Sequence, residues 1–288
     1  MAFLAVPEPF DLALTTERFR AFGLDRANLW HEGGLHRAVA GREVRIEPAA
    51  KQSGSRMNRE PSDAASSSAA SGVEVEPLDA GTEPVVRSLL GLAFDLDSFY
   101  AWSAADDVLA AIVPRLAGFR PPLTPDPFEM LVGSITAQQV SLFSAFAIRN
   151  RLIERFGERV GEVWAFPTRE RLAGVREEEL VALGFSRRKA EYVVGLARAD
   201  LDLDALATLP DAEVKGRLTG LRGLGEWTAD WFLARHLARP HAWPWGDLAL
   251  RKAVAALYRG LDVREAGARF HPFENLTAHY LLLAQRVP

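Results

Sequence analysis

The segment LRGLGEWTAD, residues 221–230, places Gly223 and Gly225 on either side of the apolar Leu224 and leads at once into a helix-forming run. Glycine adopts positive φ at little cost and allows other groups to approach the backbone closely. A Gly-x-Gly turn before a helix presents that helix's free N–H groups and positive dipole end to an anion such as a phosphate. A plain glycine-rich turn between two helices is the alternative interpretation, and both predict a helix on each side.

Helix-forming residues flank this turn, with RLTGL (217–221) before it and WTADWFLARHL (227–237) after it. Further on, the lone acid Asp247 precedes the run LALRKAVAALY (248–258), in which apolar residues recur at helical spacing. We therefore expect Asp247 at a helix N-terminus, where it can point into a cleft. A simple N-cap is the alternative role for this residue, and one aspartate can serve both roles.

The helical pattern extends over residues 81–288, because apolar residues recur there every three or four positions. Asp126 followed by Pro127 predicts the start of a long helix that runs through Gln138 and Gln139. Ser186 predicts the start of another helix in the same way. We expect an all-helical domain over residues 81–288.

Residues 1–80 have a different character and predict a small α/β domain. The runs 9–19 (PFDLALTTERF) and 35–48 (LHRAVAGREVRIEP) suit strands, with Gly41 as a turn, and 73–77 (VEVEP) alternates like a strand. Between them, residues 49–72 are rich in Ser and Ala and have almost no large apolar residue. Such a segment buries too little surface to offset its ordering entropy, so it predicts a flexible loop.

The composition is that of an ordinary globular protein, with 48% hydrophobic and 25% charged residues in 288. No cysteine occurs, which excludes disulfides, thiol nucleophiles, cysteine zinc sites and cysteine-ligated iron–sulfur clusters. The net charge of −4 does not indicate a nucleic-acid partner, so any such interpretation depends on local geometry. With no membrane-length apolar run and no basic start, we expect a cytoplasmic protein.

LRGLGEWTADWF (221–232) followed by WPWGDLALRKAV (243–254) resembles the helix–hairpin–helix DNA glycosylase superfamily, whose signature is this hairpin plus a downstream catalytic aspartate. Within it the chain is most similar to the bacterial 3-methyladenine DNA glycosylase II branch. AQQVS (137–141) and RPPLTPDPFE (120–129) carry this closer likeness. The resemblance is good over residues 85–288 and loose over 8–80. It implies a mainly α fold, a helix–hairpin–helix glycosylase body with a small α/β N-terminal domain.

The resemblance implies that Asp247 is catalytic. Breaking an N-glycosidic bond builds positive charge on the sugar, which a nearby carboxylate stabilises. Members of the superfamily that also cut the strand carry a lysine after the hairpin, because their covalent route needs an amine. Trp227 stands at that position here. We therefore expect a monofunctional glycosylase that excises alkylated bases of the 3-methyladenine and 7-methylguanine type and leaves an abasic site.

Four residues are candidates for the wall of the base pocket. Trp227 and Trp231 are four residues apart and share one helix face, where electron-rich rings suit a methylated, cationic base. Leu248 and Phe273 stand where the resembled enzymes carry aromatic residues, which leaves the lesion range open. A role for all such aromatics in the core is the alternative. Trp243 and Trp245 flank Asp247 and fit either place.

The resemblance also implies how the chain holds DNA. Gly223, Leu224, Gly225 and Thr228 would form the phosphate-binding hairpin. Gln138 and Gln139 would fill the gap left by the flipped nucleotide, since base extrusion leaves a hole in the duplex. The backbone carbonyls at the hairpin would coordinate a monovalent cation, Na or K, that bridges to phosphate; they belong to Thr219, Leu221 and Leu224.

We expect no required cofactor, a monomer, and damaged double-stranded DNA as the partner, with the protein near the nucleoid if the source is bacterial. The histidines show no metal-binding spacing. Two alternatives stay open. One is a glycosylase for another damaged or mispaired base, and the other is a non-catalytic helix–hairpin–helix DNA-binding protein, against which Asp247 argues.

Overall fold

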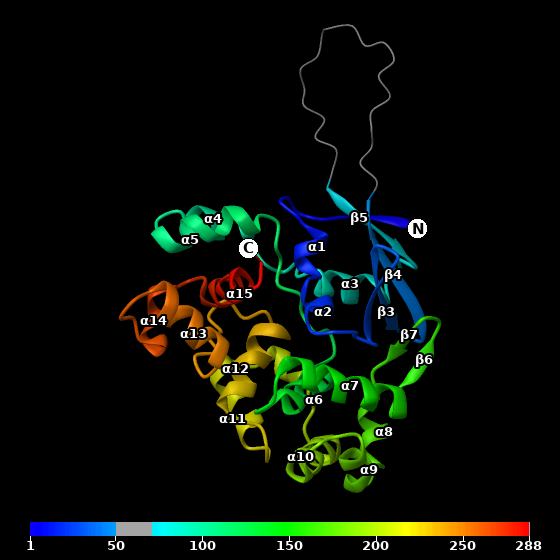
Figure 1. Ribbon diagram of the computed structural model, residues 1–288. Coiled ribbons are helices and arrows are strands. Elements are labelled where there is room, and N and C mark those ends of the chain that lie inside the picture. Colours follow the sequence, from blue (N-terminus) through cyan, green and yellow to red (C-terminus); the bar gives the residue numbers. More distant parts are fainter. Residues whose placement is uncertain (50–70, 288) are drawn as a thin grey trace, which may run out of the picture.

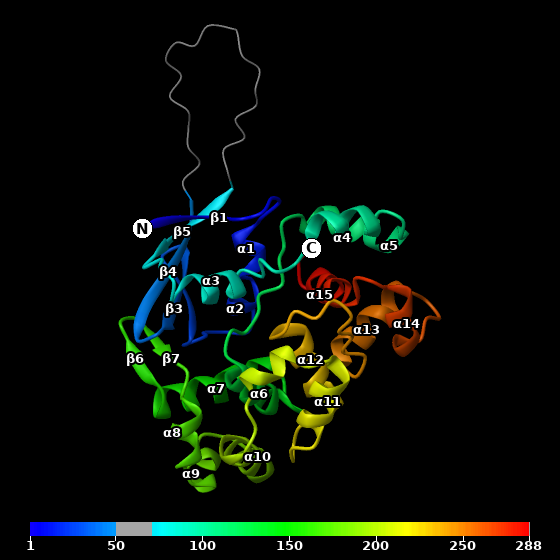
Figure 2. The same cartoon turned by 180° about the vertical axis from the view of Figure 1, so that it is seen from behind.

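The computed structural model describes residues 1–49 and 71–287. An antiparallel sheet with three short helices forms the N-terminal part, and a set of helices forms the rest of the molecule (Figures 1 and 2). This confirms the predicted mainly α fold with a small α/β N-terminal part. Residues 50–70 of the segment predicted to be flexible, 49–72, lie outside the described residues.

The sheet has the strand order β1-β5-β4-β3-β2 with antiparallel neighbours. The predicted turn at Gly41 is confirmed, because β3 and β4 pair from Val39 and Arg42 across Ala40 (φ 49°) and Gly41 (φ 73°). Two residues of positive φ form the tight hairpin turn that matches strand twist. The strands are β1 Ala2–Ala5, β2 Asn28–His31, β3 Gly34–Val39, β4 Arg42–Pro48 and β5 Gly72–Glu76.

The strand predicted over residues 9–19 is wrong, because these residues form two short helices, α1 (Leu12–Thr15) and α2 (Arg18–Ala21). The Asp11 side chain accepts the backbone N–H of Leu14 at 2.9 Å, which caps α1 and favours the helix over a strand. Both helices pack on the sheet part, and α2 reaches toward the helical body (Figure 1).

One core holds the N-terminal part together. Leu35 and Ile46 point from the sheet into it, and α3 (Glu83–Leu89) adds Val86 and Leu89. The core therefore extends past the predicted domain boundary at residue 80, and that boundary stays a prediction. A second, larger core lies inside the helical body.

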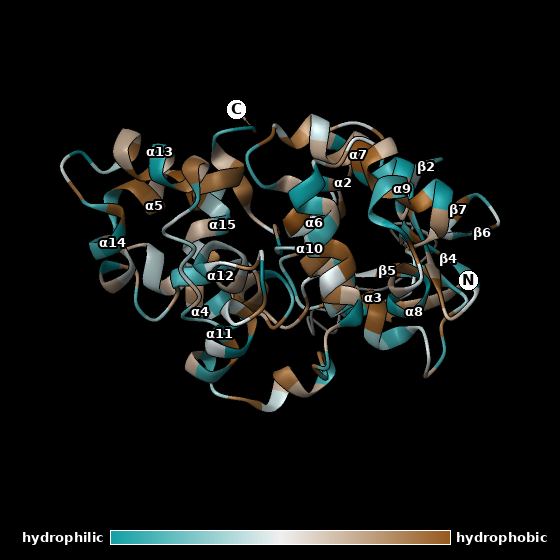
Figure 3. Ribbon diagram, turned by 90° about the horizontal axis from the view of Figure 1, so that it is seen from below, coloured by the Kyte–Doolittle hydropathy of each residue, from teal (hydrophilic) through white to brown (hydrophobic). Residues whose placement is uncertain are grey.

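Within the helical body, α6 (Pro127–Ala137) packs against α7, α10 and α12, and the N-cap Asp126 and Pro127 begin it as predicted. Brown and teal alternate along most helices in Figure 3, as expected for elements with one buried and one exposed face. Its other helices are α4 Leu96–Ser103, α5 Asp107–Ile112, η1 Val113–Leu116, α7 Leu142–Phe156, α8 Arg169–Ala173, α9 Glu177–Ala182, α10 Arg187–Arg198, η2 Asp204–Thr208, α11 Asp211–Thr219, α12 Glu226–Arg235, α13 Leu248–Leu257, α14 Val263–Arg269 and α15 Glu274–Ala284.

The single long helix predicted through Gln138 and Gln139 is wrong. Helix α6 (Pro127–Ala137) ends before Gln138, and α7 begins after Ser141, whose side chain accepts the N–H of Ser144 at 3.2 Å. Gln139 has φ 55°, a conformation that breaks a helix. Ser141 was the available signal for this break, since serine is a common N-cap.

The prediction that residues 81–288 are all helical also needs a correction. Strands β6 (Glu158–Val160) and β7 (Val163–Ala165) form a small hairpin within the helical body. The N–H of Trp164 donates to the carbonyl of Arg26 at 3.0 Å, so the hairpin bonds to the segment that precedes β2. None of the described helices is both long and apolar enough to cross a membrane.

A buried ionic cluster joins the two parts of the molecule. Glu129 of α6 forms ion pairs with Arg37 of β3 and, at 2.6 Å, with Arg149 of α7. Arg149 also pairs with Asp25, which precedes β2. Burial would raise the pKa of Glu129, yet the two guanidinium groups hold that pKa below its usual value. The cluster fixes α6 and α7 against the sheet.

Candidate active site

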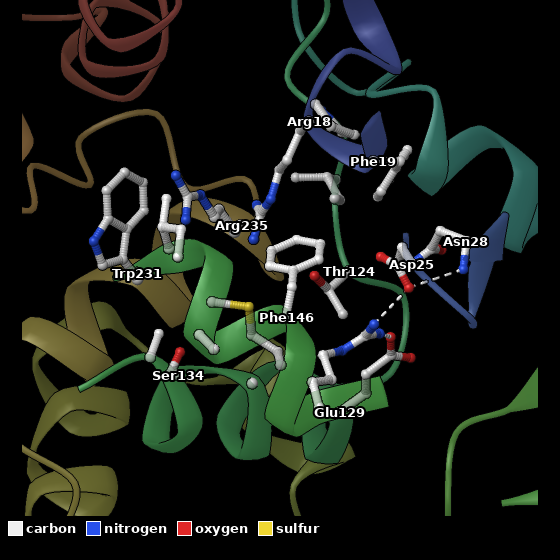
Figure 4. Close-up of a pocket in the computed structure, with 18 of the residues that line it drawn as sticks. Arg18, Phe19, Asp25, Asn28, Thr124, Glu129, Ser134, Phe146, Trp231 and Arg235 are labelled. Carbon is white, nitrogen blue, oxygen red and sulfur yellow. Dashed lines mark hydrogen bonds and ion pairs between the residues drawn. The ribbon is translucent and has the colours of Figure 1, made fainter. Parts of the chain in front are cut away.

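A cavity of about 170 Å³ lies between the N-terminal part and the helical body. It draws its walls from α2, α6, α7 and α12, and Figure 4 shows Arg18 entering from one side and Trp231 and Arg235 from the other. An engineered cavity of about 150 Å³ holds a benzene ring, so this one has room for a small aromatic group. Its lining includes Arg18, Phe146, Trp227, Trp231, Arg235 and Asp247.

Asp247 lines this cavity as the N-cap of α13. Its Oδ1 accepts the backbone N–H groups of Ala249 at 2.9 Å and Leu250 at 3.0 Å. Its Oδ2 accepts the indole N–H groups of Trp227 at 3.0 Å and Trp231 at 3.1 Å. Four donors on two helices therefore hold the carboxylate in one orientation, and both roles expected from the sequence are compatible with this geometry.

The two tryptophans bind Asp247 from one face of α12, as their spacing predicts. Trp231 is only 1% exposed, while Trp227 is half-buried. The guanidinium carbon of Arg235 lies 3.5 Å from the ring centre of Trp231. One face of Trp231 is therefore already covered by a cation, and the His279 ring packs against Trp231 at a steep angle with a centroid distance of 5.6 Å.

Leu248 and Phe273, the other two candidates for the base pocket, do not line the cavity. Leu248 is 64% exposed. Phe273 packs against Phe99 and Trp102, with ring centres 5.7 and 5.4 Å away. Both side chains point elsewhere because Leu248 lies in the exposed first turn of α13 and Phe273 joins an aromatic cluster with α4.

Trp243 and Trp245 also contact residues outside the cavity. Trp243 is buried and donates its indole N–H to the carbonyl of Val263 at 2.7 Å. Trp245 stacks under Arg264, whose guanidinium carbon is 4.0 Å from the ring centre. Both tryptophans fix the loop before Asp247 to α14.

The glycine hairpin joins α11 to α12 as the sequence predicts. Gly223 has φ 92°, and a Cβ there would overlap the ring of Tyr192, so only glycine fits. Gly225 is the N-cap of α12 and has open space around its Cα. Leu224 and Thr228 are buried and anchor the turn, while no side chain caps the first N–H groups of α12.

An ion pair connects the two helices of the hairpin. Lys215 of α11 lies 2.5 Å from the carboxylate of Asp230 in α12. Asp230 is 1% exposed, and burial raises its pKa even though Lys215 acts in the opposite direction. Sequence reasoning missed this pair because the partners are fifteen positions apart on two helices.

The loop between α6 and α7 lies beside the hairpin. Gln138 donates its side-chain N–H to the carbonyl of Gly223 at 2.9 Å, which ties the loop to the hairpin. Gln139 is exposed, and the apolar side chains of Val140 and Phe143 next to it are 40% and 63% exposed. Apolar side chains exposed together often mark a contact surface.

Two groups of residues have ligands suited to a metal. At the hairpin, Thr219 ends α11, so its carbonyl lacks a helical partner, while the Leu221 carbonyl accepts the N–H of Leu224 at 3.1 Å. Far from it in sequence, His241, His271 and Glu274 offer ligand atoms within 4.8 Å of one another. Sequence analysis missed this second group because the segments that carry it meet only in the folded protein.

The comparisons with known proteins agree with the predicted resemblance. Residues 132–267 match the family model described as HhH-GPD superfamily base excision DNA repair protein. The matched segment contains the hairpin, both cavity tryptophans and Asp247, whereas Arg18 lies outside it.

Three relatives illustrate the likeness. DNA-3-methyladenine glycosylase of Bacillus subtilis is 31% identical over 57% of this chain and 58% of its own length. DNA-3-methyladenine glycosylase 2 of Escherichia coli is 32% identical over 55% and 58%. The solved 3-methyladenine DNA-glycosylase from Archaeoglobus fulgidus is 25% identical, with a TM-score of 0.83 over 99% of this chain and 98% of that one. The chain spans just over half the length of these two curated relatives.

Proposed function

We propose that this protein is a monofunctional DNA glycosylase that flips alkylated bases out of duplex DNA and hydrolyses their N-glycosidic bond. The observation that carries the proposal is the Asp247 carboxylate, which four N–H donors hold at a cavity with room for an aromatic base. The named relatives and the match to the HhH-GPD family model support the same activity.

The chemistry follows from where Asp247 lies. When the bond between C1′ and the base nitrogen breaks, positive charge develops on the sugar. A carboxylate fixed by neutral donors keeps its full negative charge for that sugar, and a preorganised charge stabilises a transition state without reorganising. Asp247 would also orient the water that attacks C1′. A base that already carries a methyl group and a positive charge leaves as a neutral molecule.

Two neighbouring elements suit a duplex. The N-terminus of α12 beside Gly225 would bind a backbone phosphate through its free N–H groups. The loop at Gln138 and Gln139 would enter the gap left by the flipped nucleotide, with the exposed Val140 against the remaining bases. The hydrogen bond from Gln138 to the Gly223 carbonyl would keep these two elements at a fixed distance.

We propose that the backbone carbonyls of Thr219, Leu221 and Leu224 bind a monovalent cation between the hairpin and that phosphate. The end of α11 supports this, since its last carbonyls have no helical partners. The cation would add positive charge to a surface on a chain of net charge −4. Duplex affinity measured in K⁺ should then exceed that in a large organic cation at equal ionic strength.

The decisive experiment measures release of 7-methylguanine and 3-methyladenine from methylated duplex DNA by the wild type and by Asp247→Asn. Asparagine is as good an N-cap as aspartate, so the variant keeps α13 while losing the charge. Release should fall by roughly 100-fold or more, the scale for loss of a group that stabilises transition-state charge. Duplex binding should survive.

Asp262→Asn is the matched control, since Asp262 caps the next helix, α14, by accepting the N–H of Arg264 at 2.8 Å. It should release both bases at the wild-type rate. Borohydride should trap no covalent complex with DNA, because Trp227 has no amine to form one. No release by folded wild type would refute the proposal.

A further inference from the structure

Two histidines and a glutamate meet outside the cavity, where the loop before α13 reaches the start of α15. His241 belongs to the loop between α12 and α13, His271 to the loop between α14 and α15, and Glu274 to the first turn of α15. Their ligand atoms all lie within 4.8 Å of one another. None of the three lines the cavity that contains Asp247, so the proposed reaction does not account for them.

Glu274 is a buried carboxylate, 7% exposed, whose two oxygens face two different histidines. Nδ1 of His241 lies 3.1 Å from its Oε2, and Nδ1 of His271 lies 3.2 Å from its Oε1. Among residues 1–49 and 71–287, no Lys or Arg forms an ion pair with Glu274. Neutral imidazoles can satisfy the two oxygens by hydrogen bonds, but they leave the buried negative charge without a counterion. Buried charges are normally paired or bound to a metal, and a metal ion would supply the missing charge here.

The distances among the three side chains suit a zinc ion. Zinc binds imidazole nitrogen and carboxylate oxygen at about 2.0–2.2 Å in a tetrahedral arrangement, so two of its ligand atoms lie roughly 3.3 Å apart. The separations of 3.1 and 3.2 Å are close to that value. The two imidazole rings stack with centroids 4.8 Å apart, and both Nδ1 atoms lie toward the same carboxylate. The side chains of His241 and His271 are 51% and 65% exposed, so they can adjust to one ion and leave its fourth position to water.

The backbone already holds these ligands close together. Asn275, which follows Glu274, is fully buried, and its backbone N–H donates to the carbonyl of Pro240 at 3.0 Å. The side chain of Asn275 donates to the carbonyl of Arg239 at 2.9 Å. The loop that carries His241 is therefore bonded to the first turn of α15 directly before that histidine. Zinc would have little chain to order on binding, and preorganised ligands bind more tightly for that reason.

We propose that His241, His271 and Glu274 bind a zinc ion, which holds the loop that leads to Asp247 against the start of α15. The donor set favours zinc over magnesium and calcium, because those two ions prefer sites made of oxygen ligands, whereas imidazole nitrogen suits zinc. The ion stabilises the folded protein and takes no part in the chemistry at Asp247. The inference does not depend on the glycosylase function.

Titration of the untagged full chain with Zn²⁺, after a chelator has removed any bound metal, tests the site. The wild type should bind one zinc ion per chain at micromolar zinc, and a large excess of Mg²⁺ should not compete. His271→Ala and Glu274→Gln should each weaken binding by at least about 100-fold, because losing a residue that only supports a ligand already costs about 10–100-fold. His271→Cys supplies a thiolate ligand and should bind within about tenfold of the wild type. His31→Ala, at an exposed histidine of β2 that lies 3.6 Å from Glu32, is the matched control and should bind like the wild type.

Thermal unfolding gives an independent measurement. A ligand that binds only the folded state raises the unfolding temperature as its concentration increases. Zinc should do this for the wild type and His31→Ala but not for His271→Ala. The His271 side chain is exposed, so His271→Ala decides the test if Glu274→Gln does not fold. Three results would each overturn the inference: no zinc binding by the folded wild type, binding that His271→Ala leaves unchanged, or binding without a rise in unfolding temperature. None of these results bears on base release by Asp247.

Discussion

Two of the three carboxylates that line the cavity, Glu129 and Asp247, are held in opposite ways. Glu129 sits between Arg37 and Arg149, so its charge is matched by cations on two other elements. Asp247 accepts hydrogen bonds from two indoles and two backbone N–H groups, all of them neutral. Both arrangements satisfy the oxygen atoms, but only the second leaves the negative charge without a contacting counterion.

This difference distinguishes a carboxylate with a structural role from one whose charge is available for the proposed reaction. The charge of Glu129 is neutralised in ion pairs with Arg37 and Arg149, and these pairs fix α6 against the sheet. Neutral donors fix Asp247 as firmly in position and leave its charge available to a sugar that becomes positive. Substitutions at each carboxylate and at its hydrogen-bond donors test whether Glu129 serves stability and Asp247 serves activity.

The largest effect should come from Glu129→Gln. Removing one member of a buried ionic cluster leaves the others uncompensated, which costs about 3–5 kcal/mol of unfolding free energy. Urea unfolding at pH 7 measures this cost. Glu83→Gln, which breaks the exposed pair with Arg87, should cost under about 0.5 kcal/mol. A small and equal loss of unfolding free energy in Glu129→Gln and Glu83→Gln would contradict the structural role of Glu129.

Glu129 should also dominate acid unfolding. Its pKa is lower in the folded protein than the unfolded value of 4.5, so its contribution is complete above that pH and is lost as pH falls through the folded pKa. The stability of Glu129→Gln should therefore fall less steeply than that of the wild type as pH decreases below about 5, where the unfolded carboxyl begins to bind a proton. Parallel curves for variant and wild type would contradict this assignment.

Asp230 is an intermediate case, a buried carboxylate with one cation. Because Lys215 is 44% exposed, Lys215→Met should cost only about 1–2 kcal/mol. The folded pKa of Asp230 is raised above 3.8, so folding favours its protonated form and this group destabilises the protein as pH rises through the raised pKa. Lys215→Met should increase this loss of stability between pH 4 and pH 7, because it removes the cation that pairs with Asp230. The control Lys252→Met on α13 should leave the loss unchanged. Denaturant unfolding at pH 4 and pH 7 measures the stability of both variants.

The neutral donors of Asp247 can be removed one at a time. Trp227→Phe deletes one of the two hydrogen bonds to Oδ2 and should lower the rate of base release by about tenfold, the scale of one hydrogen bond to a charged group. Single-turnover release from methylated DNA gives this rate. Trp245→Phe removes an indole that has no bond to Asp247 and should keep the wild-type rate. A fall in both would point to a general loosening of the loop.

A smaller effect on stability belongs to the residue with the largest proposed effect on activity. Asp247→Asn keeps the N-cap of α13 but replaces the oxygen that accepts the two indole N–H groups, so the unfolding free energy should fall by about 1–3 kcal/mol, less than for Glu129→Gln. Thermal unfolding of the purified variant tests this directly. A loss as large as that of Glu129→Gln would make Asp247 another structural carboxylate and would remove the contrast between the two.

The parts of the site that depend on local sequence were predictable. Gly223 and Gly225 define the hairpin, and the spacing of Trp227 and Trp231 places both rings on one face of α12. An aspartate before a helical run predicts an N-cap, which is where Asp247 lies. In each case the chemistry of a few neighbouring residues determines the local conformation.

The parts that depend on long-range packing were not predictable. Arg18 and Arg235 are more than two hundred positions apart, and no periodicity brings them to one cavity. Leu248 and Phe273 were expected in the base pocket. In the structure, Leu248 is exposed to solvent and Phe273 packs against Phe99. Apolar and polar residues alternate in segment 9–19 as they do in a strand. The hydrogen bond by which the Asp11 side chain caps α1 favours a helix there instead.

The cavity is shared between the segment that matches the family model and a part of the chain outside that match. Residues 132–267 supply the carboxylate and the indoles, whereas Arg18 and Asp25 come from the part outside the family match. Substitutions in the N-terminal part can therefore reshape the wall of the cavity without touching the groups that hold Asp247. If Asp247 breaks the glycosidic bond as proposed, the choice of base and the breaking of the bond can be altered separately in this molecule.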